Sequence, residues 1–294
     1  MKELCHKSYS IPSYHMRVQL IFGYCLVGLL AIGVIQADEK KQDFTQQVNA
    51  VSFVMKYIPS GSFMMGCGVL DQPCYAGDST LHFSAAQQQW KQVNGFYLAE
   101  TETTWDLYQI CITEKACPDN RAHGGDNGWG KGSRPIIEVS WLDVNQYFLP
   151  WLNKKTQKSY RLPFEYEWEY AARAGTNSRF SWGNTISCVQ AHYGFSGDEC
   201  ENRASTQKTK SYQPNAFGLY DMHGNVWEMV QDCWQLTPHF FPSDKPSGAC
   251  EEIVLRGGSW LNTGDYLASA VRYRHNKTYR ESGDGFRLAL SVSN

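Results

Sequence analysis

The chain has 294 residues, of which 42% are hydrophobic and 14% aromatic, and its formal net charge is −2 at pH 7. This composition can bury one large core or two modest ones, and it excludes a disordered or fibrous protein. Because there is no basic surplus, neither nucleic acid nor anionic lipid is expected as a partner.

The N-terminal segment has the pattern of a secretory signal peptide. An apolar stretch follows Arg17 and ends at a small residue, Ala37, before the polar sequence DEKKQD. We expect residues 1–37 to be removed, with Met16 as an alternative start. A membrane anchor is the competing interpretation, although about 16 apolar residues fall short of the roughly 20 that span a bilayer. Cleavage predicts an exported protein, periplasmic or extracellular, with no stable membrane insertion.

Ten cysteines occur in the chain, and eight of them follow the predicted signal peptide. An even number of cysteines in an exported chain favours disulfide bonds. The eight fall into four local couples separated by 7, 6, 12 and 17 positions, so pairing between neighbours is the simplest prediction, although sequence alone does not fix connectivity. Free buried thiols are the alternative, and the absence of a CxxC spacing disfavours zinc. The eight are Cys67, Cys74, Cys111, Cys117, Cys188, Cys200, Cys233 and Cys250.

The first predicted elements follow a polar linker over residues 38–50. We expect one folded domain from about Val51 to residue 294. The stretch FVMKYIPSGSFMMG predicts two strands joined by a turn. In TETTWDLYQICI, Thr103 is a candidate helix cap, with Asp106 three residues later.

Two further helices are predicted downstream. The sequence SWLDVNQYFLPWLN offers Ser140 as a cap, and Pro150 is expected to bend or end that helix. The next helix is predicted over residues 164–174, with Trp168 facing the core. Beyond it, Gly, Pro, Asn and Ser recur every few residues, which predicts little regular secondary structure.

No local motif predicts catalysis. The glycine-rich segment over residues 123–135 lacks the flanking strand and helix of a phosphate cradle and is expected to be a surface loop. Neither a Gly-x-Ser-x-Gly elbow nor an HExxH motif occurs. Iron is not excluded, because dispersed histidines can converge with a carboxylate, although a structural role is the simpler explanation for each. The histidines in question are His192, His223, His239 and His275.

The stretch NAFGLYDMHGNVWEMVQDCW, residues 215–234, suggests a cation site. Asp221 and Glu228 place two carboxylates around a glycine turn, and backbone carbonyls between them can complete an oxygen cage of the kind that calcium favours. The alternative is that Asp221 caps a short helix and Glu228 is solvated. The spacing alone does not separate the two.

Six segments resemble, in the same order, the sulfatase-modifying-factor family, whose members include the formylglycine-generating enzymes. They are YIPSGSFMMG, SRPIIEVSW, YRLPFEYEWEYAARAG, NAFGLYDMHGNVWEM, VLRGGSW and GFRLAL. The resemblance covers about residues 51–290. It implies a single compact α+β domain related to the C-type lectin fold, with low regular secondary structure, and the cysteines predict that disulfides staple it.

The resemblance also implies a calcium site, which favours the cation interpretation. Its matching positions here are Asp221, the carbonyls of Gly224 and Val226, and Glu228.

The chain departs from the family pattern at a second calcium site and at the start of the helix predicted over residues 164–174. A second calcium site of the family would begin at Asn202 and the carbonyl of Arg203, but no partner aspartate is evident before Asp221. Phe164 stands where the family usually has Thr or Ser, which caps the helix together with Glu167. Because Phe cannot accept that hydrogen bond, the helix start loses about 1 kcal/mol unless another group compensates.

The largest departure lies in the segment RGGSWLNTGDYLASAVRYRHN. In the oxygen-dependent formylglycine-generating enzymes, two cysteines that bind copper(I) follow the GGS by three and eight residues. Counting from Ser259 places Asn262 and Leu267 at those positions. Copper(I) needs soft thiolate ligands, which an amide and an isobutyl group cannot replace. Copper is therefore not expected, and the chain is predicted to be a divergent member with a degenerate site.

Whether the chain is an enzyme stays open, with three functions to consider. The first is a calcium-stabilised scaffold that binds an unknown protein or small-molecule ligand, without copper-dependent formylglycine-generating activity. The second is a metal-dependent oxidase or maturation enzyme of the same family, and the third is a true sulfatase-modifying enzyme that uses a non-copper route. The predicted binding surface of the scaffold comprises Trp260, Asn262, Tyr266, Arg272, Tyr273, Arg274 and Tyr279. The alternative for Trp260, Arg272 and Arg274 is a structural role within the fold.

Overall fold

The structure is a computed structural model. It describes residues 41–68, 84–85, 88–194, 200, 203–235 and 251–292. Within these ranges, no helix has the length and hydrophobicity needed to cross a membrane. The predicted signal peptide lies outside the described residues, as do His239 and Asn202.

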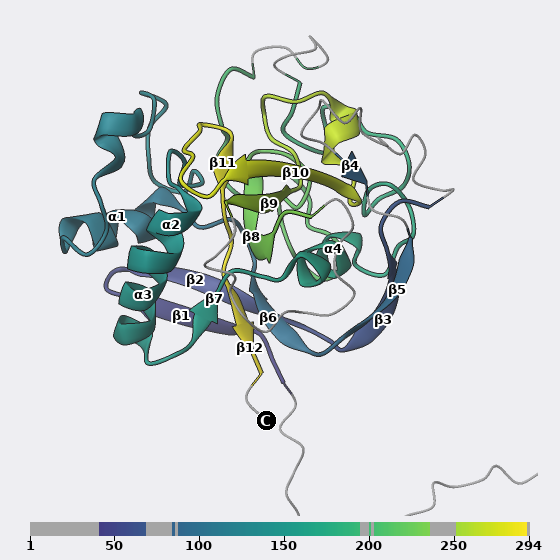
Figure 1. The fold of residues 1–294 in the computed structure, drawn as a ribbon, viewed down its shortest axis with the longest axis horizontal. Helices are drawn as coiled ribbons and strands as arrows, with labels where there is room; N and C mark the ends of the chain where they lie inside the picture. Colours follow the sequence, from purple (N-terminus) through teal and green to yellow (C-terminus); the bar gives the residue numbers. More distant parts are fainter. Residues whose placement is uncertain are drawn as a thin grey trace, which may run out of the picture. The chain divides into compact units, whose positions relative to one another are not determined.

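Two five-stranded sheets and a two-stranded ribbon contain the strands of the described part (Figure 1). The first sheet has the order β1-β2-β6-β12-β7, so β12, near the end of the chain, lies between β6 and β7. Its strands are β1 (Phe44–Val48), β2 (Val51–Ile58), β6 (Phe96–Ala99), β12 (Ala289–Ser291) and β7 (Tyr160–Arg161).

The second sheet has the order β11-β8-β9-β10-β4 and carries the C-terminal segment of interest. Strands β8, β9 and β10 are antiparallel neighbours, whereas β11 pairs in parallel with β8. The strands are β11 (Asp284–Gly285), β8 (Trp227–Cys233), β9 (Glu252–Arg256), β10 (Val271–Asn276) and β4 (Ser84–Ala85). The separate ribbon pairs β3 (Gly61–Met65) with β5 (Gln89–Val93).

Strand β1 corrects the predicted start of the domain. The sequence predicts a polar linker over residues 38–50, but Phe44 lies opposite Met55 and Val48 opposite Val51 in an antiparallel pair with β2. Phe44 is partly buried and Val48 is buried, while the residues between them alternate in exposure. This alternation is the signature of a half-buried strand, and the polar composition of the segment obscures it.

The helices are short, as the sequence predicts. The expected strands around PSG are also present, although β2 and β3 belong to different sheets. The helical segments are α1 (Trp105–Thr113), a 3-10 turn η2 (Asn120–His123), α2 (Trp141–Asp143), a π-helical segment η3 (Val144–Phe148), α3 (Leu149–Thr156), α4 (Glu165–Arg173) and a 3-10 turn η4 (Gly264–Leu267).

Helix α1 begins differently from the prediction. Thr104, not Thr103, occupies the cap position, and its side chain makes no capping hydrogen bond. Instead, the N–H groups of Trp105 and Asp106 donate to backbone carbonyls in a loop that follows the helix in the chain, at Arg134 and Gly132 respectively, over 2.9 and 3.1 Å. A distant backbone segment therefore satisfies donors that a side-chain cap usually satisfies.

The predicted cap at Ser140 is confirmed. Its hydroxyl accepts from the N–H of Asp143 at 3.1 Å, and the Asp143 carboxylate accepts from the N–H of Ser140 at 2.9 Å, which completes a capping box. Pro150 does not end the helical stretch, which continues to Thr156. The π-helical turn of η3 precedes the proline, and such a turn accommodates the irregularity that a missing N–H imposes.

Helix α4 occupies the predicted position, and other residues replace the missing cap at Phe164. The N–H of Phe164 donates to Glu167 at 2.9 Å, and the N–H of Glu165 donates to the carboxylate of Asp232 at 2.6 Å. Asp232 comes from β8 and so supplies the acceptor that Phe164 lacks. Trp168 is fully buried, as the helical periodicity predicts.

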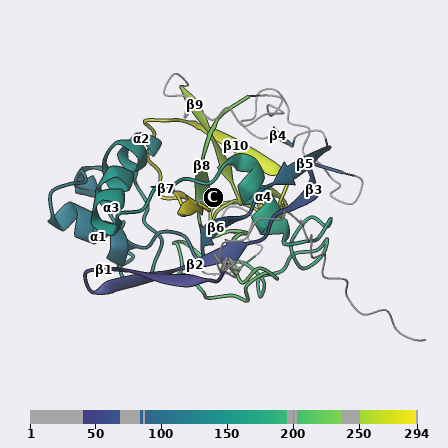
Figure 2. The ribbon, with the colours of Figure 1, turned by 90° about the horizontal axis from the view of Figure 1, so that it is seen from below.

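Helix α4 also organises part of the core, because it lies among β3, β5, β8 and β9 (Figures 1 and 2). Trp168 and Ala171 pack in one apolar cluster with Phe63 of the ribbon and with Val230 and Val254 of the second sheet. The helix therefore joins these two sets of strands.

Two of the predicted disulfides are confirmed. Cys111 is bonded to Cys117 and Cys188 to Cys200, so these couples pair locally. Cys67 and Cys233 are also disulfide-bonded, whereas Cys74 and Cys250, their predicted partners, lie outside the described residues.

Candidate functional site

The candidate site begins where the chain leaves β9. Gly257 and Gly258 have φ angles of 96° and 74°, in the region that glycine adopts most easily. A Cβ at Gly258 would lie 2.6 Å from Cδ1 of Leu267. The second glycine therefore permits direct packing of Leu267 against the backbone.

Asn262 and Leu267, the positions at which the resemblance predicts copper ligands in relatives, both act in the framework. The side-chain oxygen of Asn262 accepts from the N–H and the hydroxyl of Ser259, each at 2.9 Å, and its backbone carbonyl accepts from Gly194 at 2.8 Å. Leu267 is fully buried in the larger core cluster, and its carbonyl lies 2.7 Å from Nδ1 of His223. Neither side chain supplies a thiolate.

Two of the candidate iron-binding histidines are buried and structural. Burial lowers the pKa of both His192 and His223 to about 4, so both are neutral at pH 7. Each has a ring nitrogen 2.7 Å from a backbone carbonyl, at Ser205 and Leu267 respectively. They hold loops together and do not share a metal-binding group with His275 in the described ranges.

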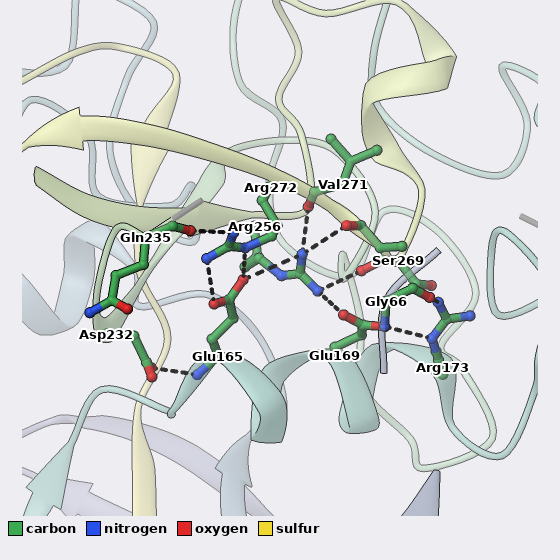
Figure 3. A network of polar contacts seen from close by, with 11 residues as sticks. Gly66, Glu165, Glu169, Arg173, Asp232, Gln235, Arg256, Ser269, Val271 and Arg272 are labelled. Carbon is green, nitrogen blue, oxygen red and sulfur yellow. Dashed lines mark hydrogen bonds and ion pairs between the residues drawn. The ribbon is translucent and has the colours of Figure 1, made fainter. Parts of the chain in front are cut away.

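A buried network of charges fixes the segment that follows (Figure 3). The guanidinium of Arg256 pairs with Glu169 of α4 and donates to the carbonyls of Ser269 and Val271, each at 2.8 Å. Arg173 pairs with the same carboxylate at 2.9 Å. Because all these side chains are almost fully buried, the chain around residues 269–271 is held against α4.

Arg272 belongs to the same network, which corrects its assignment to a binding surface. Its guanidinium pairs with Glu165 and donates to the carbonyl of Gln235 at 2.8 Å, and only 1% of the residue is exposed. Trp260 is likewise only 5% exposed, and its indole N–H donates to the carbonyl of Ser282 at 3.1 Å. A guanidinium with a buried carboxylate partner and an almost fully buried indole with a backbone acceptor stay inside, so neither residue lines an exposed surface.

The other predicted surface residues are more accessible. Tyr279 is 52% exposed. Asn262, Tyr266 and Tyr273 are partly buried, and Arg274 is partly buried and pairs with Glu252 at 2.8 Å.

The predicted calcium carboxylates lie in different surroundings. Glu228 is buried in β8, where its oxygens accept from Arg287, at 2.6 Å each, and from the indole N–H of Trp168 at 2.8 Å. Asp221 accepts from the N–H of Lys210 at 2.8 Å. The alternative of a solvated Glu228 is therefore wrong, and Asp221 caps no helix among the described elements.

Glu102 joins this region and was not predicted from sequence. It is 1% exposed, one of its carboxyl oxygens accepts from the side chain of Asn225 at 3.0 Å, and its carboxyl group also lies within hydrogen-bonding reach of the carboxyl group of Asp221. Burial, followed by the charge of Asp221, raises the pKa of Glu102 well above its usual range. Burial also raises the pKa of Asp221 to about 6.

The position of Glu102 explains why it escapes sequence analysis. It precedes α1 and meets the 221–228 region only through the fold, where the N–H of Tyr220 donates to the carbonyl of Glu100 at 2.9 Å. It also lines a cavity of about 350 Å³, together with Thr103 and Lys210. No local motif signals this pairing.

The second calcium site implied by the resemblance falls only partly within the described residues. Asn202 lies outside them, and the guanidinium of Arg203 donates to the carbonyls of Cys188 and Ala191. Arg203 thereby holds residues 188–191 in place next to the Cys188–Cys200 disulfide.

The chain belongs to the family described as the sulfatase-modifying factor enzyme 1-like domain, whose profile matches residues 40–292. It is 35% identical over 180 residues to a formylglycine-generating enzyme of Streptomyces coelicolor, covering 54% of each protein. It is also 33% identical over 182 residues to the inactive C-alpha-formylglycine-generating enzyme 2 of Mus musculus, covering 56% of this chain and 53% of that protein.

Structural similarity confirms the α+β fold. The solved structure of PvdO from Pseudomonas aeruginosa matches with a TM-score of 0.69 and 28% identity, over 86% of this chain and 100% of that one. The chain spans only between 25% and 54% of the length of the first curated relatives that it matches.

The raised pKa of Asp221 predicts a pH dependence of stability when no metal is bound. An unfolded Asp ionises near pH 4, so the folded state opposes ionisation, and the free energy of unfolding falls as the pH rises from about 4 to about 6. In chelator, Asp221→Asn should gain up to about 3 kcal/mol relative to wild type between about pH 4 and pH 7. Urea unfolding at several pH values measures this, and a constant difference would contradict it.

Proposed function

We propose that the chain is an exported, calcium-stabilised binding domain of the formylglycine-generating-enzyme-like family that lacks copper-dependent formylglycine-generating activity. One observation carries the proposal. The side chains of Asn262 and Leu267 both have structural roles. Asn262 accepts hydrogen bonds from Ser259, and Leu267 is buried in the core. No thiolate is available at these positions for copper(I).

The similarity to an inactive mouse relative supports the loss of this chemistry. That protein's name shows that the domain persists in the family without the activity. The chain is 35% identical to the formylglycine-generating enzyme and 33% identical to the inactive relative. Overall sequence identity therefore does not decide whether this chain has the activity. The residues at the site therefore decide the proposal.

The proposed calcium ion would be held by the carboxylates of Asp221 and Glu102, assisted by backbone carbonyls near Gly224 and Val226. Glu228 contributes to the charge of the region but is already engaged by Arg287. The support is the proximity of two buried carboxyl groups, those of Glu102 and Asp221, since burial disfavours the ionised form of each and the two charges repel one another. A hard divalent cation that binds both carboxylates would offset this cost.

The proposed contact surface is smaller than the sequence predicts, because Trp260 and Arg272 are excluded from it. It centres on Tyr279, with the partly buried Tyr266 and Tyr273 as further contacts. Tyrosines suit such a surface because they offer a large rigid ring with a polar tip. Export is supported by the disulfides, which persist in oxidising compartments.

The proposal predicts no aldehyde product from a sulfatase-type peptide. The purified chain, incubated with a CxPxR peptide, copper and oxygen, should leave the peptide thiol unchanged by mass spectrometry. The Streptomyces coelicolor relative serves as the positive control. Conversion of the cysteine to the aldehyde would contradict the proposal and favour a non-copper route if it also occurred without copper.

Calcium is predicted to stabilise the protein at neutral pH. When calcium is about 100-fold above its dissociation constant, the free energy of unfolding should rise by about 3 kcal/mol. Asp221→Asn and Glu102→Gln should lose most of this gain, whereas Asp126→Asn, in the exposed glycine-rich loop, should retain it. Thermal or urea unfolding with and without calcium gives the comparison, and equal gains in all four proteins would contradict the assignment.

A further inference from the structure

A second group of metal-binding side chains lies apart from the proposed calcium site. His275 is near the end of β10, Asp284 begins β11, and Glu281 lies in the connection between them. One ligand atom from each lies within 4.8 Å of the other two. Among the described residues, no other three His, Cys, Asp or Glu side chains meet this spacing.

The imidazole of His275 is oriented as in a metal site. Its Nδ1 lies 2.6 Å from a carboxylate oxygen of Asp284, and its Nε2 lies 2.8 Å from the hydroxyl of Tyr273. From this geometry we assign the proton to Nδ1, which donates to Asp284, so Nε2 is the acceptor for the Tyr273 hydroxyl, and an ion at Nε2 would take the place of that hydroxyl hydrogen. A carboxylate that holds the outer nitrogen of a ligating imidazole is a usual arrangement in metal sites.

The position of Glu281 matches a second ligand. Its carboxylate oxygen lies 3.5 Å from Nε2 of His275. Two ligands that are each about 2.0–2.1 Å from a tetrahedral ion are about 3.4 Å from one another. An ion can therefore bind both groups without movement of the backbone.

An unpartnered oxygen gives independent support. Asp284 is 3% exposed, and its second carboxylate oxygen has no hydrogen-bond partner in the described part of the chain. A buried carboxylate oxygen without a partner is costly. The guanidinium of Arg280 does not supply the missing donor, because it is held by Asp143 through two contacts of 2.8 Å.

The surrounding charges also favour a cation. The carboxylates of Glu281 and Asp284 lie 3.5 and 2.6 Å from the ring nitrogens of His275, and the backbone N–H of Glu138 donates to the carbonyl of Glu281 at 3.2 Å. Two carboxylates thus flank one imidazole. A divalent ion would neutralise charge that His275 alone cannot.

We propose that His275 and Glu281 bind a divalent first-row transition ion of the zinc class, with Asp284 orienting the imidazole and completing the ligand set directly or through water. An imidazole nitrogen combined with carboxylate oxygens suits such an ion better than copper(I), which selects thiolates. The side chain of Glu281 is 38% exposed, and the 52%-exposed ring of Tyr279 lies 4.7 Å from that of His275. The ion therefore has access from solvent.

Cobalt(II) is the probe for this site, and zinc is the competitor. The full chain is stripped with a chelator and titrated with cobalt(II), and its visible absorption is followed. We expect one equivalent to bind with an absorption band that zinc abolishes. His275→Gln and Glu281→Gln should each weaken binding at least tenfold, whereas Glu251→Gln, a 74%-exposed carboxylate beside Lys277, should bind as wild type.

The outcome is separable from the calcium proposal, because Asp221→Asn should leave cobalt binding unchanged. Absence of a zinc-sensitive band in wild type would overturn the site, as would wild-type affinity in both cluster variants. Circular dichroism checks the fold of each variant. If His275→Gln is misfolded, the partly exposed Glu281→Gln variant decides the question alone, since wild-type affinity there would remove Glu281 as a ligand and overturn the proposal.

Discussion

The buried ion pair between Arg256 and Glu169 is the interaction on which the C-terminal half of the domain depends. It joins the end of β9 to α4, and the same guanidinium holds the carbonyls of Ser269 and Val271. Removing one partner of such a pair leaves a buried charge uncompensated, at a cost of about 3–5 kcal/mol. The path of the chain from β9 to β10 is therefore set by charges on a helix far away in sequence.

This constraint shapes what the segment over residues 259–271 can do. With its ends fixed by Arg256 and Arg272, the segment places Leu267 in the core and folds Asn262 back onto Ser259. A segment held in this way can present the side chains beside it in fixed positions. It is less suited to forming covalent bonds with a substrate through its own residues. The proposed metal site lies outside this segment, at the cluster of His275, Glu281 and Asp284 that begins near the end of β10.

Local signals in the sequence predict local features well. The capping box at Ser140, the inward face at Trp168 and the disulfide of Cys111 with Cys117 each depend on residues close in sequence, and all are present. The acceptor that Asp232 provides to α4 and the approach of Glu102 to Asp221 depend on the completed fold, so no window of sequence contains them. The prediction for Arg272 is wrong for a related reason. The sequence alone does not show whether an arginine side chain is exposed to solvent or paired with a buried carboxylate, as Arg272 is with Glu165.

The central claim is that Asn262 and Leu267 have become part of the framework, and the stability of the variant Asn262→Ala/Leu267→Ala tests it most directly. Truncation of a buried leucine costs about 2–5 kcal/mol, and the lost hydrogen bonds of Asn262 add about 1 kcal/mol or more. The account predicts that urea unfolding will show a loss of at least about 3 kcal/mol. A change within about 0.5 kcal/mol, typical of surface positions, would contradict it.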